Sequence, residues 1–358
     1  MVDIEVSLDG GETIVPNFDW QDLNSNSDFD PYSSSTSPGA IILVVLSFWA
    51  LAISVPGLTW HIRNRNLPAA SMVGWIVYLN LINIINALLW PNDNINSWWN
   101  GQVYCDLVIK LSIAGGMGLV GSLACIMRAL AQALDTNNIR LMPSKSQRIR
   151  QLVLENFLCV ILPLALALLH FAIQPLRFYI FAIAGCEASY NNRWYTVLLS
   201  FIWPPVICVV NGYYAILLII RIYRYRRDFS SILASSTSGM NKSRFLRLFV
   251  SALTVLLVAI PTQAYALYVN AVNIQNDSWT PASWQTIVYV PTYGTVFPDC
   301  WIHVGIAVPV FLCFGWGKDA NSVYRSWLRL LGFTKVFPAL AAKTDNSSLL
   351  PSPVTNKR

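Results

Sequence analysis

Lys110 is the side chain whose position most needs a chemical explanation, because it lies inside an otherwise apolar run. Asp106 precedes it by four residues, the favourable acid-before-base order for an ion pair on one helix face. A charge at membrane depth is costly and by default marks a functional site. It can equally be a local pair whose lysine reaches back to the membrane surface along its methylene stem. Both interpretations stay open on the sequence.

Asparagines form a second group of polar residues among apolar ones. Asn80, Asn83 and Asn86 recur at intervals of three, which places them on one side of a helix. Amides of this kind inside a membrane either bond neighbouring helices together or contact a ligand. Asn211 and Gln263 allow the same two interpretations.

Side chains suited to catalysis or metal binding are sparse. The chain has three histidines and seven cysteines with no Cys-x-x-Cys pair, and it lacks the His-Glu-x-x-His and Gly-x-Ser-x-Gly patterns. The glycine-rich stretch 114–118 lacks the Lys-Ser/Thr of a phosphate-binding loop and favours close helix packing instead. We therefore expect no catalytic residue, no metal and no cofactor.

Long apolar runs are the elements that must position these residues. Hydrophobic residues make up 55% of the 358-residue chain and charged residues only 12%, about half the charge of a typical soluble protein. A helix needs roughly 20 apolar residues to cross a bilayer. Seven stretches meet that requirement, so we expect an all-α membrane protein with a seven-helix transmembrane bundle. They are 39–62, 69–90, 103–133, 152–173, 194–222, 245–272 and 294–316.

The distribution of charge predicts how these spans are oriented. Residues 1–38 contain eight acidic residues and no basic one, whereas 21 of the 24 lysines and arginines fall together on the other side of the predicted spans. Loops rich in Lys and Arg stay in the cytoplasm. We therefore expect the amino terminus outside the cell and the carboxyl terminus in the cytoplasm.

In this orientation Cys105 and Cys186 both lie on the outer side, where disulfides persist. A bridge between them would hold the second outer loop over the bundle, and the alternative is two unpaired thiols. Asn276 begins the sequence Asn276-Asp277-Ser278 in the third outer loop and is a candidate glycosylation site.

Composition divides the chain into four segments. Residues 1–38 form an acidic, polar outer tail, and 39–317 form the membrane domain. In 318–333, apolar residues at helical spacing with arginines on another face predict a short amphipathic helix on the inner leaflet. Residues 334–358 are polar, and we expect a disordered cytoplasmic tail.

Four arginines follow the fifth span within seven residues: Arg221, Arg224, Arg226 and Arg227. Basic residues beside a membrane attract anionic headgroups by about 1 kcal/mol each, and they also determine which way the helix points. Membrane lipid is therefore one expected partner of this cluster.

The ordered motifs of the membrane domain resemble those of one receptor family. They include "WHIRNRN" after the first span, "YCDLVIKL" at the start of the third, "AGCEASY" in the second outer loop and "WPPVICVVNGYYAILLIIRIYRYRRDF" in the fifth. With "NKSRFLRLFVSALTVLLVAIP" they extend over residues 40–332. The chain resembles the fungal mating-pheromone receptors of the a-factor (lipopeptide) type, which are class D G-protein-coupled receptors. The Asp/Glu-Arg-Tyr and Asn-Pro-x-x-Tyr motifs of the best-known receptor class are missing.

The resemblance implies a plasma-membrane receptor that binds a short prenylated peptide pheromone and activates a heterotrimeric G protein (alpha and beta-gamma). We expect no nucleic-acid partner, and the small residues of the third span are compatible with a homodimer. The alternative function is a seven-span transporter or channel for a small apolar or peptide substrate, although no inverted repeat supports it. The candidate ligand-binding residues are Asn83, Asp106, Lys110, Glu187, Gln263, Tyr265 and Asp299. The candidate G-protein contacts are Arg63, Arg128, Arg221, Arg224, Arg226, Arg227 and Arg244.

Overall fold

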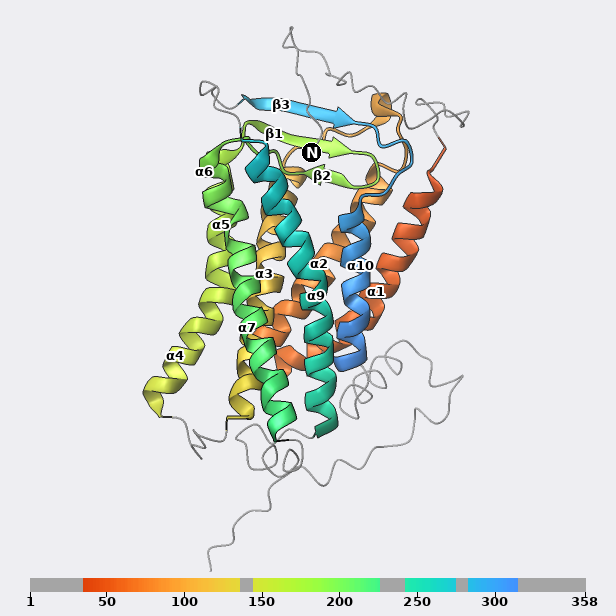
Figure 1. The fold of residues 1–358 in the computed structure, drawn as a ribbon. Helices are drawn as coiled ribbons and strands as arrows, with labels where there is room; N and C mark the ends of the chain where they lie inside the picture. The colour runs from red at the N-terminus through yellow and green to blue at the C-terminus, as the bar shows by residue number, and fades with distance from the viewer. Residues whose placement is uncertain (1–34, 136–143, 226–241, 275–282, 315–358) are drawn as a thin grey trace, which may run out of the picture.

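The computed structural model describes residues 35–135, 144–225, 242–274 and 283–314. These residues form a bundle of long helices with a small sheet lying across one end (Figure 1). We call the two ends of the bundle the sheet end and the opposite end. Most of the predicted outer tail 1–38, Arg226, Arg227, Asn276, the amphipathic helix 318–333 and the tail 334–358 lie outside the described residues.

Within the described ranges, six helices are long and apolar enough to cross a membrane, which makes the chain a multi-pass membrane protein. The first three are α1 (Pro38–Arg63), α2 (Leu67–Leu89) and α3 (Tyr104–Ala133). The fourth is composed of α4 (Lys145–Asn156), a π-helical turn (Phe157–Ile161) and α5 (Leu162–Ile173). The fifth and sixth are α7 (Trp203–Arg224) and α9 (Lys242–Val272).

A further apolar helix, α10 (Pro298–Phe314), is shorter, with 17 residues described. It contacts α1, α2 and α9 inside the bundle, where the sequence predicts the seventh span (Figure 1). Six of the seven predicted spans are therefore confirmed as membrane-length helices.

Local sequence explains where two of these helices begin. At the start of α4, Ser144 and Gln147 form a reciprocal capping box, which satisfies two backbone N–H groups that would otherwise lack partners. α7 follows a short helix, α6 (Trp194–Thr196), and a π-helical turn (Val197–Phe201). Its first turn contains two prolines, Pro204 and Pro205, where their missing N–H groups break no helical hydrogen bond.

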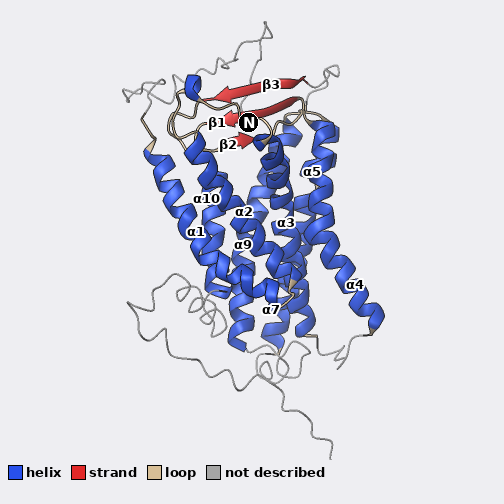
Figure 2. Cartoon of the chain, turned by 180° about the vertical axis from the view of Figure 1, so that it is seen from behind, coloured by secondary structure: helices blue, strands red, loops and turns tan. Residues whose placement is uncertain are grey.

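The sheet is a correction to the all-α expectation. β1 (Leu176–Phe181) pairs antiparallel with β2 (Gly185–Glu187) and parallel with β3 (Ser283–Val290), giving the order β2-β1-β3. Tyr179 is opposite both Glu187 and Val288 in this pairing. The view from behind shows the sheet crossing the ends of the helices (Figure 2). Aromatic and β-branched residues dominate β1 and β3, which is the composition that strands favour.

α3 is the most deeply buried of the six long helices, and its glycines explain how its neighbours approach so closely. A Cβ added to Gly118 would lie 2.1 Å from Nε1 of Trp75 on α2. One added to Gly121 would lie 2.2 Å from the backbone oxygen of Leu158, in the π-helical turn. Both distances are far below van der Waals contact, so the glycine-rich stretch serves packing, as its position in an apolar run predicts.

Candidate functional site

A cavity of about 380 Å³ lies inside the bundle beneath the sheet. α2, α3, α9 and α10 form its walls, and the segment Ala184–Tyr190, which contains β2, closes it at the sheet end. Its lining on α3 extends from Ile109 to Leu123, which corresponds to about 21 Å of helix. The cavity is therefore long and narrow, a shape suited to an extended chain.

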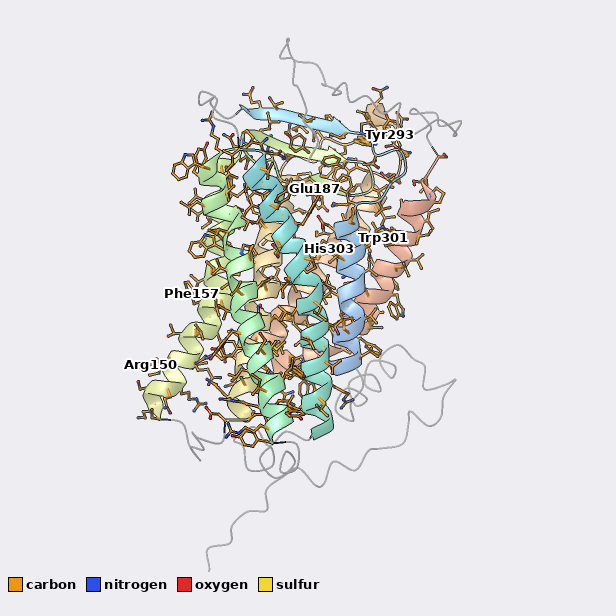
Figure 3. All side chains as sticks on the ribbon, in the orientation of Figure 1. Arg150, Phe157, Glu187, Tyr293, Trp301 and His303 are labelled. Atoms are coloured by element: carbon orange, nitrogen blue, oxygen red, sulfur yellow. A yellow bond between two sulfur atoms is a disulfide. The ribbon has the colours of Figure 1, made fainter. Side chains whose placement is uncertain are left out.

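The two ends of this cavity differ in chemistry. Its deep part is lined by apolar side chains such as Leu79, Leu123 and Val255, which belong to the main hydrophobic core of the bundle. Near the sheet, Glu187 and Asp299 contribute carboxylates. In Figure 3 Glu187 lies just below the sheet and His303 further down the bundle. A ligand with an apolar part and a polar part would match this change from an apolar to an acidic lining.

The segment that closes the cavity is held by a disulfide between Cys105, at the start of α3, and Cys186 in β2. This confirms the predicted bridge. Gly185, beside Cys186, has a φ of +74°, and a Cβ there would lie 2.3 Å from Cγ of Asn86. Only glycine lets this strand approach α2 so closely.

The asparagines of α2 are used to bond neighbouring elements together. Asn80 donates to the backbone oxygen of His303 (3.0 Å), and Asn83 donates to that of Cys300 (3.1 Å), so both hold α10. Asn86 donates to the backbone oxygen of Ala184 (2.6 Å) in the closing segment. Each carbonyl belongs to another element, so these amides hold the cavity walls together.

Lys110 and Asp106 do not pair with each other as their spacing predicts. Asp106 accepts two hydrogen bonds from Arg177 in β1, with N···O distances of 2.6 and 3.1 Å. This charge-assisted pair raises the pKa of the Arg177 guanidinium above its ordinary value. Tertiary packing thus gave Asp106 a partner from the sheet, 71 residues away in the chain.

Lys110 instead turns toward α5. Its ammonium donates to Nδ1 of His170 and to Oε1 of Gln174 (2.7 Å), and it lies 3.8 Å from the centre of the Phe171 ring. Nε2 of His170 donates to the backbone oxygen of Ser189 (3.0 Å), which leaves Nδ1 as the acceptor. Lys110 therefore ties α3 to α5 and, through His170, to the segment after β2.

Asp93, which follows α2, holds the loop between β3 and α10. Its carboxylate accepts from the backbone N–H groups of Thr292 (2.7 Å), Tyr293 (3.1 Å) and Gly294 (3.1 Å). Tyr293 and Gly294 have φ values of +52° and +74°, a turn that points successive N–H groups at one anion. The sequence contains no local signal for this long-range contact.

Four of the seven candidate ligand-binding residues line the cavity: Asn83, Glu187, Gln263 and Asp299. The other three lie elsewhere, because Asp106 and Lys110 are engaged as described and Tyr265 is 68% exposed on the outside of the bundle. The polar lining residues that the sequence did not single out as ligand contacts are Asn86, Ser112, Tyr190, Thr262 and His303. Burial raises the pKa of the hydroxyl of Tyr190, one of the residues that line the cavity. In the described ranges, no three His, Cys, Asp or Glu side chains converge to hold a metal ion.

The arginines gather at the opposite end. Arg63 ends α1 and Arg224 ends α7, both exposed, whereas Arg128 is half-buried on α3. Arg221 of α7 is engaged within the bundle, where it donates to the backbone oxygen of Ala131 and lies 3.6 Å from the carboxylate of Asp135 at the end of α3. The backbone of Arg244 lies in the first turn of α9.

These features define a helical membrane protein with a ligand-sized cavity inside the bundle, under a disulfide-anchored cover. The sequence profile described as the pheromone A receptor (STE3) matches residues 42–333. The chain belongs to this family.

Individual relatives agree with that assignment. The chain is 27% identical to the pheromone a factor receptor of Saccharomyces cerevisiae over 299 residues, covering 81% of this chain and 63% of that receptor. It is 26% identical to the pheromone M-factor receptor of Schizosaccharomyces pombe over 312 residues, covering 83% and 82%. The match to the pheromone B alpha 3 receptor of Schizophyllum commune is 26% and covers 65% of this chain but 36% of that receptor. The chain thus spans only part of the length of several relatives.

Proposed function

We propose that this chain is a plasma-membrane G-protein-coupled receptor for a short prenylated peptide pheromone. The observation that carries the proposal is the narrow cavity, apolar in its depth and acidic beneath its cover, in a member of the pheromone A receptor family. A lipid chain gains about 0.8 kcal/mol for each buried CH₂, so the apolar depth would supply much of the affinity. The cavity lies within one chain and needs no second copy, although a homodimer stays compatible.

In this proposal the sheet end faces outward and α10 crosses the membrane as the seventh span. The disulfide between Cys105 and Cys186 supports that direction, because disulfides persist in oxidising compartments. The arginines at the opposite end support it as well, since basic loops stay cytoplasmic. Residues 1–38 would form the outer tail, 318–333 an amphipathic helix on the inner leaflet and 334–358 the cytoplasmic tail.

The volume of the cavity limits how the ligand enters. About 380 Å³ lies at the small end of the range for single drug-sized ligands. The prenyl group and the residue that bears it would occupy this space, and the remainder of the peptide would contact the sheet and the loops above it. Asn83, Glu187, Gln263 and Asp299 are the proposed contacts within the cavity.

Signalling requires that the ligand bind one packing of the helices better than another. The cavity contacts α9 and α10, so a bound chain would bias their positions, and the ends of α7 and α9 would then rearrange. Exposed basic side chains at that end, including Arg63 and Arg224, are the proposed contacts for the G protein and for anionic lipid.

The test is nucleotide exchange on a heterotrimeric G protein by the full chain in lipid nanodiscs. Synthetic peptides ending in an S-farnesyl cysteine methyl ester are compared with the same peptides lacking the farnesyl group. We expect exchange to rise only with farnesylated peptides. If no farnesylated peptide raises exchange, the receptor proposal fails and the transporter alternative gains support.

A further inference from the structure

Two carboxylates share the end of the cavity nearest the sheet. Glu187 comes from β2 and Asp299 from the first turn of α10, and both line the cavity. The pKa of Glu187 is raised to about 8, mainly by the burial of its carboxyl group and secondly by the nearby negative charge of Asp299. Asp299 is exposed and Glu187 is half-buried. Two like charges near each other disfavour ionisation of the more buried group unless a cation joins them.

No described residue supplies that cation. The cavity lining contains neither lysine nor arginine. Two basic side chains of neighbouring elements are engaged elsewhere, since Lys110 of α3 bonds His170 and Gln174 and Arg177 of β1 pairs with Asp106. The acidic end of the cavity is therefore left to be neutralised by a proton or by a ligand.

His303 supplies a second, independent sign that something binds here. It lines the cavity one helical turn after Asp299, and its Nδ1 is buried without a hydrogen-bond partner among the described residues. Its position is determined by α2, because Asn80 bonds its backbone oxygen while Asn83 bonds that of Cys300. Buried polar atoms are usually paired, so this nitrogen of a cavity-lining residue has a place for a hydrogen-bond partner from a ligand.

We propose that Glu187 and Asp299 recognise one ammonium group of the ligand, with His303 as an additional neutral partner. The inference rests on the proposed function: the ligand would be a lipopeptide whose prenyl chain fills the apolar depth and whose ammonium lies where the peptide leaves it. A lysine side chain near the prenylated cysteine matches this arrangement. An anionic or wholly neutral peptide at this point would leave Asp299 without a counter-charge and would not favour ionisation of Glu187.

The experiment compares two peptides that end in the same S-farnesyl cysteine methyl ester and carry an acetylated amino terminus. One contains a free lysine beside that cysteine, and the other contains acetyl-lysine. Binding to the full chain in nanodiscs is measured for the wild type, Glu187→Gln, Asp299→Asn and a control, Glu155→Gln. Glu155 lies on α4 away from the cavity, so the control removes a carboxylate of the same type.

We expect the wild type and Glu155→Gln to bind the lysine peptide about tenfold or more tightly than the acetyl-lysine peptide. In Glu187→Gln and Asp299→Asn that ratio should fall toward one. Equal binding of the two peptides by the wild type overturns the inference. So does an undiminished ratio in both cavity variants.

A second pair of small molecules, octylammonium and octanol, tests the ammonium site without assuming that the chain is a pheromone receptor. If neither farnesylated peptide binds, the receptor proposal fails, and octylammonium is then compared with octanol. We expect octylammonium to raise the unfolding temperature of the wild type more than octanol does, with the difference lost in Glu187→Gln. No such difference would overturn the ammonium site itself.

The pH dependence gives a further check. Lysine stays protonated up to pH 9, whereas the Glu187 carboxyl, with a pKa of about 8, is mostly protonated at pH 6.5. Binding the ammonium there must expel a proton, so affinity for the lysine peptide should rise between pH 6.5 and 8.5. The other titratable groups lining the cavity are Asp299, Cys300, His303 and Tyr190, while α2, α3 and α9 present none. A rise that persists unchanged in Glu187→Gln would contradict this assignment.

Discussion

The two ends of this bundle are held together in different ways. At the sheet end, segments far apart in the chain are joined by a disulfide, by the Arg177–Asp106 ion pair, by the Asp93 carboxylate and by backbone pairing between β1 and β3. At the opposite end of the described chain, apolar packing dominates and Arg221 makes the main polar connection between α3 and α7. Directional bonds fix one geometry, whereas apolar contacts can exchange neighbours at low cost.

This difference suits a molecule that receives a ligand at one end and rearranges at the other. The cover of the cavity has its geometry determined before any ligand arrives, which limits the ordering entropy lost on binding. The opposite end retains the freedom that a change of packing needs. Substitutions at the two ends should therefore have different effects. Those at the sheet end should lower the stability of the fold, and those at the opposite end should raise basal signalling.

Replacing both Cys105 and Cys186 with serine should have the largest effect. The bridge closes a loop with a sequence separation of 81 residues, and losing such a bond typically costs about 2–5 kcal/mol of unfolding free energy. We expect a lower unfolding temperature and loss of ligand binding. Cys208→Ala, which removes a buried thiol that forms no disulfide, serves as the control. Unchanged thermal stability in the double variant would remove the main support for a rigid sheet end.

Asp93→Ala should rank next, because it leaves three backbone N–H groups at the β3–α10 turn without their acceptor. An unsatisfied buried donor costs about 1–3 kcal/mol, and Thr292 is buried. Hydrogen exchange should accelerate at Thr292, Tyr293 and Gly294. Asp93→Asn keeps one acceptor oxygen and should lose less, so equal losses in both variants would contradict the assigned role.

Gly121→Ala tests the packing of α3 between the two ends. The added methyl would meet the backbone oxygen of Leu158, and overpacking typically costs about 1–3 kcal/mol. Gly116→Ala is the matched control, because nothing lies within 4 Å of its added Cβ and alanine favours a helix. Chemical denaturation should show opposite signs for the two variants. A tolerated Gly121→Ala would mean that the π-helical turn at Leu158 shifts easily.

Arg221→Gln should have the smallest effect on stability and the most specific effect on signalling. Its pair with Asp135, whose side chains are only 21% and 23% exposed, contributes on the order of 1 kcal/mol, and that energy favours one packing of α3 and α7. Losing it should raise basal nucleotide exchange about fivefold, the ratio that 1 kcal/mol supports. Arg224→Gln, at an exposed position on the same helix, should not raise basal exchange, and should lower it because Arg224 is a proposed G-protein contact. A rise in both variants would indicate a general loss of positive charge rather than a broken contact.

The sequence predicted the helices well, and the cavity only in part. Asn83, Glu187, Gln263 and Asp299, which the sequence proposed as ligand contacts, line the cavity, because polar groups within or beside apolar runs are visible in one dimension. Tyr265, also proposed from the sequence, lies on the outside of the bundle, whereas His303, which the sequence did not single out, lines the cavity. The rotation of a helix about its axis depends on its neighbours, so the sequence could not show this. The ion pair expected between Asp106 and Lys110 failed for a related reason. Each residue found a partner on another element, and a tertiary contact with better geometry outcompetes a weak pair within one helix.

Hydrophobic length and charge distribution are local properties, so the sequence by itself determined the membrane spans, their predicted direction and the two cysteines that pair. The sheet, the partners of Lys110 and Asp106, and the cavity beneath the cover were decided only in three dimensions. β1 and β3 are separated by about a hundred residues, and their pairing depends on the bundle bringing both loops to one end. The carboxylates of Glu187, which is half-buried, and Asp299, which is exposed, then line the same cavity although they are more than a hundred positions apart in the sequence.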